Sequence, residues 1–212
     1  MSEPRRRVVV YGAGGHARVV ADVVACLGHE VIGLVDELVA AGSTRGQYAV
    51  LGSSTWLHGK AGELAVALGI GDNKIREETF QNCLRAGIAC PAFVHPRATV
   101  AASARLSDGC IVMAGAVINP GAELDVGVIV NSGSVVEHDC RVGRFAHISP
   151  NATLTGAASL GAFVHLGAGA TVLPGIEIGE RSIVGAGAVV VTAVPAGVVA
   201  FGVPARVVRE RT

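Results

Sequence analysis

Two carboxylates and two imidazoles lie close together in the short stretch VVEHDCRVGRFAHISP, residues 135–150. They are Glu137, His138, Asp139 and His147, inside a tract that otherwise consists mainly of small and aliphatic residues. A carboxylate next to an imidazole raises its basicity. An oriented His–Asp pair is what a general base needs in order to remove a proton from an attacking amine or hydroxyl. We therefore expect His138 to be a general base and Asp139 to be the group that tunes it.

The tract around this stretch is built from a six-residue repeat, a hexad. From Val94 to Val190 every sixth residue is aliphatic, 17 positions in phase, and the residue two before each is usually small. A period of six fits neither an α-helix nor a heptad coiled coil. It fits a short strand with two inward side chains, followed by a corner where Gly, Asn, Asp and Pro supply unusual dihedrals. Three such strands close a triangle, so the repeat predicts a stacked β-solenoid of about five to six coils.

This register places the ionisable side chains on the outside of the solenoid. His138 lies two residues after the inward Val136, at a corner, and His147 directly precedes the inward Ile148. His165 follows His147 by three hexads, one full coil, so we expect the two imidazoles to stack in adjacent coils. An ordinary surface histidine is the simpler interpretation of His165.

Two other kinds of chemistry compete for the same tract. No serine or cysteine is obviously placed as a covalent nucleophile, which favours direct transfer over a ping-pong mechanism. Three imidazoles could hold zinc between subunits, as in the β-solenoid carbonic anhydrases, but those enzymes need two histidines close together in one coil. His138 and His147 are nine residues apart (147 − 138). We therefore expect no metal.

The first 90 residues lack the six-residue period and alternate strands with helices. We expect strands at Val8–Tyr11, Val31–Val35 and Leu64–Ile70, a helix that ends at Gly28, and a second helix over residues 76–87. The apolar face of the first helix consists of Val19, Val20, Val23, Val24 and Leu27. The alternation predicts a small α/β domain over residues 1–90, and a solenoid domain with a short C-terminal extension over residues 91–212.

A glycine-rich turn, GAGGHA at residues 12–17, matches G-x-G-x-x-A between the first strand and the first helix. Its backbone N–H groups and the helix N-terminus are suited to a phosphate. The domain is about half the size of a full dinucleotide fold, which favours a mononucleotide or nucleotide-sugar, although a tight turn without a ligand gives the same pattern. The candidate contacts are Gly14, Gly15, His16, the acid Asp36 at ribose-binding spacing with Glu37 next to it, Gly71, Asp72 and Asn73 after a later strand, and Arg76 as a phosphate ligand.

Composition excludes several classes of partner. Lys+Arg and Asp+Glu balance at 17 each, so no excess charge attracts nucleic acid or an acidic membrane. No apolar run reaches the roughly 20 residues that cross a bilayer. The five cysteines are scattered and form no C-x-x-C pair, which is typical of reduced thiols in a cytoplasmic protein.

The six-residue rule and the segment LPGIEIGERSIVGAGAVVV resemble the hexapeptide-repeat acyltransferases, whose fold is a left-handed parallel β-helix. The YGAGGHA turn combined with NSGSVVEHDCRVGRFAHIS is similar, over nearly the whole chain, to the bacterial nucleotide-sugar N-acetyltransferases grouped with sialic acid O-acetyltransferases. The resemblance implies an α/β Rossmann-like domain followed by a left-handed β-helix. It also implies a homotrimer with active sites between subunits. Because the repeat never slips in phase, no protruding loop can roof the site, so a neighbouring subunit must supply that wall.

The resemblance also implies roles for individual residues. In that family the histidine matching His138 is the base, the acid matching Asp139 increases its basicity, and the histidine matching His147 contacts acetyl-CoA. Backbone amides that line the coenzyme groove match Gly156, Ala168 and Ala186. Loops that hold the nucleotide-sugar match Gly14–His16, Asp36–Glu37 and Gly71–Asn73.

We therefore expect an acetyl-CoA-dependent N-acetyltransferase that acts by direct transfer on a nucleotide-linked 4-amino-4,6-dideoxy sugar. The N–H of Gly156 is expected to stabilise the oxyanion. Three alternatives remain: O-acetylation of a sialic acid or related sugar, a non-catalytic trimeric scaffold that binds a nucleotide-sugar, and a zinc-dependent hydratase.

Overall fold

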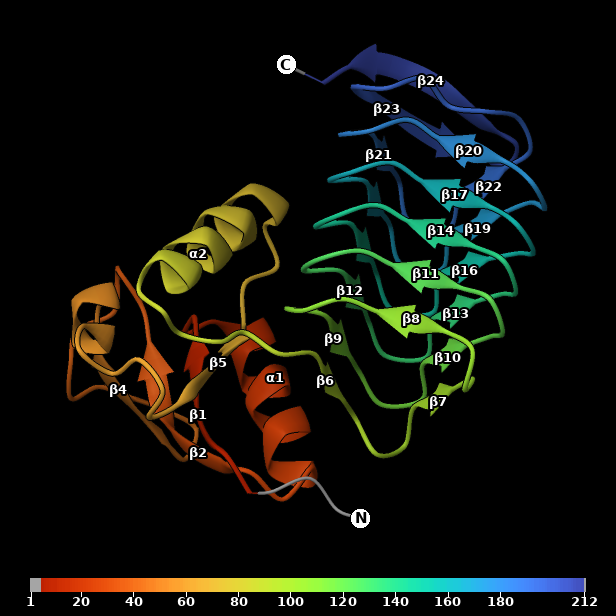
Figure 1. Cartoon of the computed structure of the whole chain (residues 1–212). Helices are drawn as coiled ribbons and strands as arrows, with labels where there is room; N and C mark the ends of the chain where they lie inside the picture. Colours follow the sequence, from red (N-terminus) through yellow and green to blue (C-terminus); the bar gives the residue numbers. More distant parts are fainter. Residues whose placement is uncertain (1–4, 212) are drawn as a thin grey trace. The chain divides into compact units, whose positions relative to one another are not determined.

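A computed structural model describes residues 5–211, and the chain divides into two compact units between Pro96 and Arg97 (Figure 1). The first unit is α/β, and the second is a three-sided parallel β-helix, so the predicted fold class is confirmed. The division lies six residues after the boundary that the sequence suggested. Within the described residues, no helix has both the length and the apolar character that crossing a membrane requires.

The first unit is built on a five-stranded sheet in the order β3-β4-β2-β1-β5. Its strands are β1 (Arg7–Tyr11), β2 (Glu30–Val35), β3 (Thr44–Arg45), β4 (Tyr48–Gly52) and β5 (Ala65–Leu68). Strand β1 pairs in parallel with both β2 and β5, and its residues from Val8 to Tyr11 are all buried. This burial on both faces explains why β1 is a continuous apolar run and does not alternate.

Two α-helices and a short 3-10 helix complete the unit: α1 (Gly15–Cys26), α2 (Asn73–Arg85) and η1 (Ser54–Leu57). A two-residue strand, β6 (Phe93–Val94), ends it. Helix α1 buries Val20, Val23 and Val24 as expected, whereas Val19 is 44% exposed and does not belong to the buried face. Helix α2 begins three residues earlier than predicted because the side chain of Asp72 caps it.

The second unit consists of two-residue strands that return to the same face with every third hexad. The first face contains β7 (Thr99–Val100), β10 (Val117–Ile118), β13 (Val135–Val136), β16 (Thr153–Leu154), β19 (Thr171–Val172) and β22 (Val189–Val190). The second contains β8 (Arg105–Leu106), β11 (Glu123–Leu124), β14 (Arg141–Val142), β17 (Ser159–Leu160) and β20 (Glu177–Ile178). The third contains β9 (Ile111–Val112), β12 (Ile129–Val130), β15 (His147–Ile148), β18 (His165–Leu166) and β21 (Ile183–Val184).

The aliphatic residue of each hexad points into the prism. From Val112 to Val190 every one of them is buried, and in neighbouring coils they pair directly, as Val136 does with Leu154. Of the earlier hexad positions, Val94 belongs to the first unit, and Val100 and Leu106 are only half-buried, because an end coil has a neighbour on one side alone. The six-residue prediction is therefore confirmed.

The corners have their own strict period. Every sixth residue from Gly109 to Gly187 has a positive φ, between 53° and 75°. Glycine adopts this left-handed conformation freely, and Asn and Asp tolerate it, but other residues are strained there. Phe145, Ala157, Phe163 and Arg181 occupy such corners, although their residue types do not predict it.

Two hairpins were not predicted. Strands β3 and β4 pair antiparallel in a stretch where the sequence predicted no strand. After the last hexad, β23 (Val198–Gly202) pairs in parallel with β21, and β24 (Ala205–Glu210) folds back on it. The short C-terminal extension is therefore an added pair of strands on the third face.

The buried aliphatic side chains of the hexads are the positions where the second unit should be most sensitive to side-chain truncation. Leu154→Ala removes a fully buried side chain between two coils and should lower the free energy of unfolding by about 2–5 kcal/mol. Val207→Ala, at a side chain that is 49% exposed, should change it by less than about 0.5 kcal/mol. Urea denaturation followed by circular dichroism measures both. Equal effects of the two changes would contradict this assignment of the core.

Candidate active site

The pair expected to be catalytic lies at the corner between β13 and β14. The Nδ1 atom of His138 is 2.9 Å from Oδ2 of Asp139. Because a carboxylate only accepts hydrogen bonds, Nδ1–H is the donor, and Nε2 of the neutral ring carries the lone pair. Both side chains are largely exposed to solvent. The geometry thus presents an accessible basic nitrogen whose tautomer is fixed by its neighbour.

The electrostatic surroundings raise the pKa of His138 above its ordinary value. The hydrogen bond to Asp139 is the main cause, and the charges of Asp139 and Glu137 add to it. The backbone N–H of His138 also donates to Oε2 of Glu137, at 3.3 Å. The cluster EHD therefore makes His138 more basic, as its sequence predicts.

Two glycines from neighbouring coils leave room for this pair. Asp139 is itself a left-handed corner residue, with φ of 60°. A Cβ at Gly121, one coil earlier, would lie 2.5 Å from Oδ1 of Asp139. A Cβ at Gly156, one coil later, would lie 2.6 Å from Nε2 of His138. The imidazole and the carboxylate each need a glycine at the contact with the adjacent coil.

Gly156 also presents an unused backbone donor. The N–H of its neighbour Ala157 donates to the carbonyl oxygen of His138 at 2.8 Å, and the carbonyl oxygen of Gly156 accepts from Gly175 at 3.0 Å. Within residues 5–211 the N–H of Gly156 itself donates to no protein acceptor. It is therefore free to bind an oxygen atom near His138.

A second polar cluster lies on the third face. The ring of His147, on β15, is 4.9 Å from the ring of His165 on β18, with the planes inclined by 58°. The predicted stacking in adjacent coils is thus present, in a tilted form. Nε2 of His147 lies 3.1 Å from Nδ2 of Asn131, and Nε2 of His165 lies 3.1 Å from Oγ of Ser149. His147 is buried, so these contacts hold its ring in place.

Asn131 and Ser149 were not predicted as site residues. Both directly follow an inward aliphatic residue, they occupy the same position in adjacent coils, and each contacts the histidine 16 residues later. A search for polar residues in register with the hexads would have found this repeated pair.

The remaining coenzyme candidates, Ala168 and Ala186, are exposed at the corner between the third and first faces. They lie in consecutive coils, and the N–H of Gly187 donates to the carbonyl oxygen of Ala168 at 2.8 Å. Gly156 and His138 lie instead at the corner between the first and second faces. One chain therefore brings together His138, Asp139 and Gly156, and separately Ala168 and Ala186, but it does not place all of them on one surface.

In the first unit, the glycine-rich turn leaves open space at the N-terminus of α1. Gly12 has φ of 116°, and a Cβ there would lie 2.7 Å from the carbonyl oxygen of Gly69, so this position requires glycine for packing. At Gly14, Gly15 and Gly71, by contrast, a Cβ would meet nothing within 4 Å. No side chain caps α1. The helix N-terminus is thus open to an anion.

The two predicted acids hold this turn and its neighbours in place. Oδ2 of Asp36 accepts from the N–H of Ala13 at 2.8 Å, and its Oδ1 accepts from Leu38 and Val39 at 2.8 and 3.1 Å. Oε1 of Glu37 accepts from the hydroxyl of Tyr11 and from the N–H of Ser54. The hydrogen bond from Tyr11 is the main reason that the pKa of Glu37 is lowered.

The segment Gly71–Arg76 is organised by its own side chains. Oδ1 of Asp72 accepts from the N–H groups of Lys74 and Ile75, both at 2.9 Å, and so caps α2. Arg76 is fully buried; it donates to the carbonyl oxygens of Ile70 and Gly71 at 3.1 Å and to Oδ1 of Asn73 at 2.9 Å. Arg76 thus holds the loop, and its direct contact with a phosphate remains a prediction.

His16, in the first turn of α1, is neutral at physiological pH. Burial, followed by the charge of Arg76, lowers its pKa to about 4. A neutral imidazole next to an open helix N-terminus adds hydrogen-bonding capacity without adding a charge.

Each of the two units matches a known protein family. Residues 7–83 match the PglD N-terminal domain family, and residues 157–192 match the bacterial transferase hexapeptide (six repeats) family. The acetyltransferase domain of PglB from Neisseria gonorrhoeae FA1090, solved with acetyl coenzyme A, is 37% identical with a TM-score of 0.90; the match covers 97% of this chain and 100% of that one.

Two further solved structures extend this similarity. A histidine-to-asparagine variant of perosamine N-acetyltransferase from Caulobacter crescentus, in complex with CoA and GDP-perosamine, is 37% identical with a TM-score of 0.91; the match covers 96% of this chain and 97% of that one. WeeI from Acinetobacter baumannii AYE is 25% identical with a TM-score of 0.89, over 95% of this chain and 99% of that one. By identity and coverage, the chain belongs to the nucleotide-sugar N-acetyltransferases of the hexapeptide-repeat superfamily, which have a left-handed β-helix fold.

Proposed function

We propose that this protein transfers the acetyl group of acetyl-CoA to the amine of a nucleotide-linked 4-amino-4,6-dideoxy sugar. The observation that carries the proposal is the His138–Asp139 hydrogen bond, which leaves Nε2 exposed beside the unused N–H of Gly156. It occurs in a chain similar over nearly its whole length to enzymes solved with CoA and GDP-perosamine or with acetyl coenzyme A.

In the proposed reaction, Nε2 of His138 accepts a proton from the sugar amine as its nitrogen attacks the thioester carbonyl carbon. A C–N bond forms, and the carbonyl oxygen becomes an oxyanion to which the N–H of Gly156 donates. The C–S bond then breaks, the oxyanion returns to a carbonyl, and CoA leaves as a thiol with the proton carried by His138. Asp139 stabilises the imidazolium that forms in between.

The thiol of Cys140 is unsuited to form an acyl-enzyme, which favours direct transfer of the acetyl group from acetyl-CoA to the amine. Cys140 follows the pair in sequence, but its side chain is buried and its Sγ donates to the carbonyl oxygen of Thr155 at 3.2 Å. Burial raises the pKa of this thiol, so it is not the reactive thiolate that an acyl-enzyme requires.

The nucleotide-sugar is assigned to the first unit. Its phosphates are proposed to bind at the open N-terminus of α1, against Gly14, Gly15 and the neutral His16. Gly71 offers a second open backbone position, and the proposed contacts of Asp36, Glu37, Asp72 and Asn73 complete the site. The N-terminus of α2 is a poorer phosphate site, because the carboxylate of Asp72 already occupies it.

The active site is proposed to form between subunits of a homotrimer. In a triangular prism the corner that carries His138 is opposite the third face, which carries His147. If His147 contacts the acetyl-CoA that His138 serves, these two side chains must come from different chains. The amides of Ala168 and Ala186, at another corner, would line the same coenzyme groove from the chain that contributes His147.

The cytoplasm is the proposed compartment. None of the five cysteines forms a disulfide in the structure, and four of them are buried, as suits a reducing environment.

Replacement of the base tests the mechanism. His138→Ala should lower kcat/KM by about 10²–10⁴-fold, with a smaller change in KM, since only proton transfer is lost. His58→Ala, an exposed histidine of the first unit, is the control and should leave the rate unchanged. Mass spectrometry of products from UDP-, GDP- and dTDP-aminosugars, together with hydroxyl-bearing analogues, measures both rate and acceptor. Near-normal turnover by His138→Ala would exclude His138 as the base, and acetylation of the hydroxyl sugars alone would exclude an N-acetyltransferase.

The pH dependence tests the role of Asp139. A base works only when it is deprotonated, so kcat/KM should rise with pH through the pKa of His138. Asp139→Asn removes the main cause of the raised pKa, so the acidic limb should move to lower pH. The maximal rate should fall because the base is weaker. NMR titration of the His138 ring in the same variant reports the pKa directly, and an unchanged value would show that Asp139 does not tune it.

Subunit mixing tests the two-chain site. His138→Ala and His147→Ala chains should each be impaired alone, the latter at limiting acetyl-CoA. After they are unfolded together and refolded as mixed trimers, about a quarter of the sites should carry both histidines, by the statistics of a cyclic trimer. Activity should recover to about that fraction. Recovery no greater than the sum of the two separate variants would indicate that one chain provides both histidines.

A further inference from the structure

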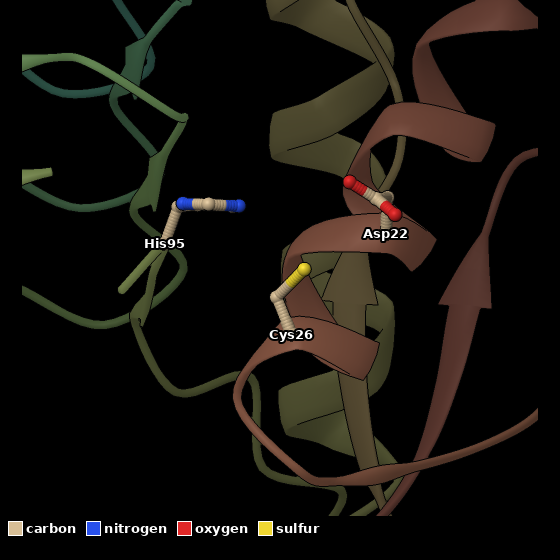
Figure 2. Close-up of side chains that lie close together, drawn as sticks. All are labelled: Asp22, Cys26 and His95. Carbon is tan, nitrogen blue, oxygen red and sulfur yellow. The ribbon is translucent and has the colours of Figure 1, made fainter. Parts of the chain in front are cut away.

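A group of three potential metal ligands lies in the first unit, apart from the residues assigned to catalysis. Asp22 and Cys26 are four residues apart on α1, and His95 follows β6. The carboxylate, the thiol and the imidazole each place one ligand atom so that all three lie within 4.8 Å of one another. In Figure 2, Asp22 and Cys26 project from successive turns of the helix, and the ring of His95 extends toward them.

The burial of the three side chains suits a site that a cation can enter. His95 is only 4% exposed, whereas Asp22 and Cys26 are exposed. A buried imidazole gives one ligand a fixed position, and two exposed side chains can change rotamer around an incoming ion. In a tetrahedral zinc site the ligand atoms lie about 3.3–3.6 Å apart, as follows from bonds of about 2.0–2.3 Å. Adjustment of the two exposed side chains by roughly 1 Å reaches that geometry.

The types of ligand select the class of ion. Thiolate and imidazole together favour Zn²⁺ among the abundant divalent cations, and a carboxylate is a common third ligand. Ca²⁺ and Mg²⁺ require mostly oxygen ligands, of which this group supplies one side chain. Cys26 is the exposed member of the five cysteines, whereas Cys83, Cys90, Cys110 and Cys140 are buried. It is therefore the thiol that is accessible to a metal.

We propose that Asp22, Cys26 and His95 form a Zn²⁺ site, with water as the fourth ligand. On binding, the thiol of Cys26 releases a proton to solvent, and its thiolate bonds to the metal. The ion then connects α1 to the segment that follows β6, two parts of the first unit that lie near its opposite ends in sequence. This zinc stabilises the unit and takes no part in acetyl transfer. Its ligands are not found from the sequence, because no local spacing pattern joins Cys26 to His95.

The experiment uses the full-length protein, stripped with a chelator under reducing conditions. Calorimetric titration with ZnCl₂ should give one bound ion per chain. Excess Zn²⁺ at about 100 times Kd should raise Tm by roughly 5–10 °C. CoCl₂ should produce a sulfur-to-cobalt charge-transfer band in the near ultraviolet, which only a thiolate ligand generates. Failure of Zn²⁺ to bind or to raise Tm overturns the proposal, and so does a cobalt spectrum without this band.

Three variants assign the ligands. Cys26→Ser and Asp22→Asn change exposed side chains and should fold normally, with zinc affinity at least tenfold lower and, for Cys26→Ser, no charge-transfer band. His95→Gln should also lose binding, although its buried position makes its own stability a separate measurement. His58→Gln, another histidine of the first unit, is the matched control and should bind as the unmodified protein does. Unchanged zinc affinity and an unchanged cobalt spectrum in Cys26→Ser would refute the site.

Discussion

The left-handed corner at every sixth residue is the constraint on which the second unit depends. It turns the chain after each two-residue strand, so that the same face returns after three hexads and pairs in parallel with itself. Corners without Gly, Asn or Asp carry a strain of about 1–2 kcal/mol each. Packing offsets this strain at Phe145 and Phe163, whose rings stack 5.9 Å apart, and the guanidinium groups of Arg144 and Arg181 lie over the ring of Phe163.

The same constraint builds the proposed catalytic pair. Asp139 is a corner residue, and its left-handed backbone is the conformation from which its carboxylate reaches Nδ1 of His138. The coil before contributes Gly121 and the coil after contributes Gly156, each at a contact that a methyl group would obstruct. Three coils therefore cooperate to position two side chains. An isolated peptide with the sequence EHD would lack both the restraint and the neighbouring N–H.

The sequence predicts the second unit better than the first because its information is periodic. Once the phase of the six-residue repeat is known, it determines which side chains point inward and which residues form corners. It also determines that His147 and His165 are neighbours. The exceptions depend on packing. The six-residue period does not predict the strained backbone of Phe145, nor that β23 and β24 extend the third face after the repeat has ended.

The first unit has no such period, and the functions of its polar residues depend on contacts between distant segments. The spacing of Asp36 from the glycine-rich turn predicts a ligand contact, but it does not predict that its carboxylate binds the N–H groups of Ala13, Leu38 and Val39. The sequence predicts Arg76 as a phosphate ligand, but it does not predict that this side chain is fully buried against the turn that it holds. Local sequence predicted that these residues follow strands at one edge of the sheet, but not the hydrogen-bond partners of each side chain.

These internal contacts reduce the electrostatic repulsion between the two carboxylates and the polyanion that is proposed to bind next to them. The carboxylate of Asp36 repels a phosphate only weakly, because backbone N–H groups donate to both of its oxygens and compensate its charge. Glu37 accepts from Tyr11, whose pKa is raised chiefly by burial, so that the phenol remains a donor. The carboxylate of Asp72 caps the N-terminus of α2, whereas no side chain caps α1. The phosphate of the proposed substrate is therefore expected at α1, because the N-terminus of α1 lacks the carboxylate that occupies that of α2.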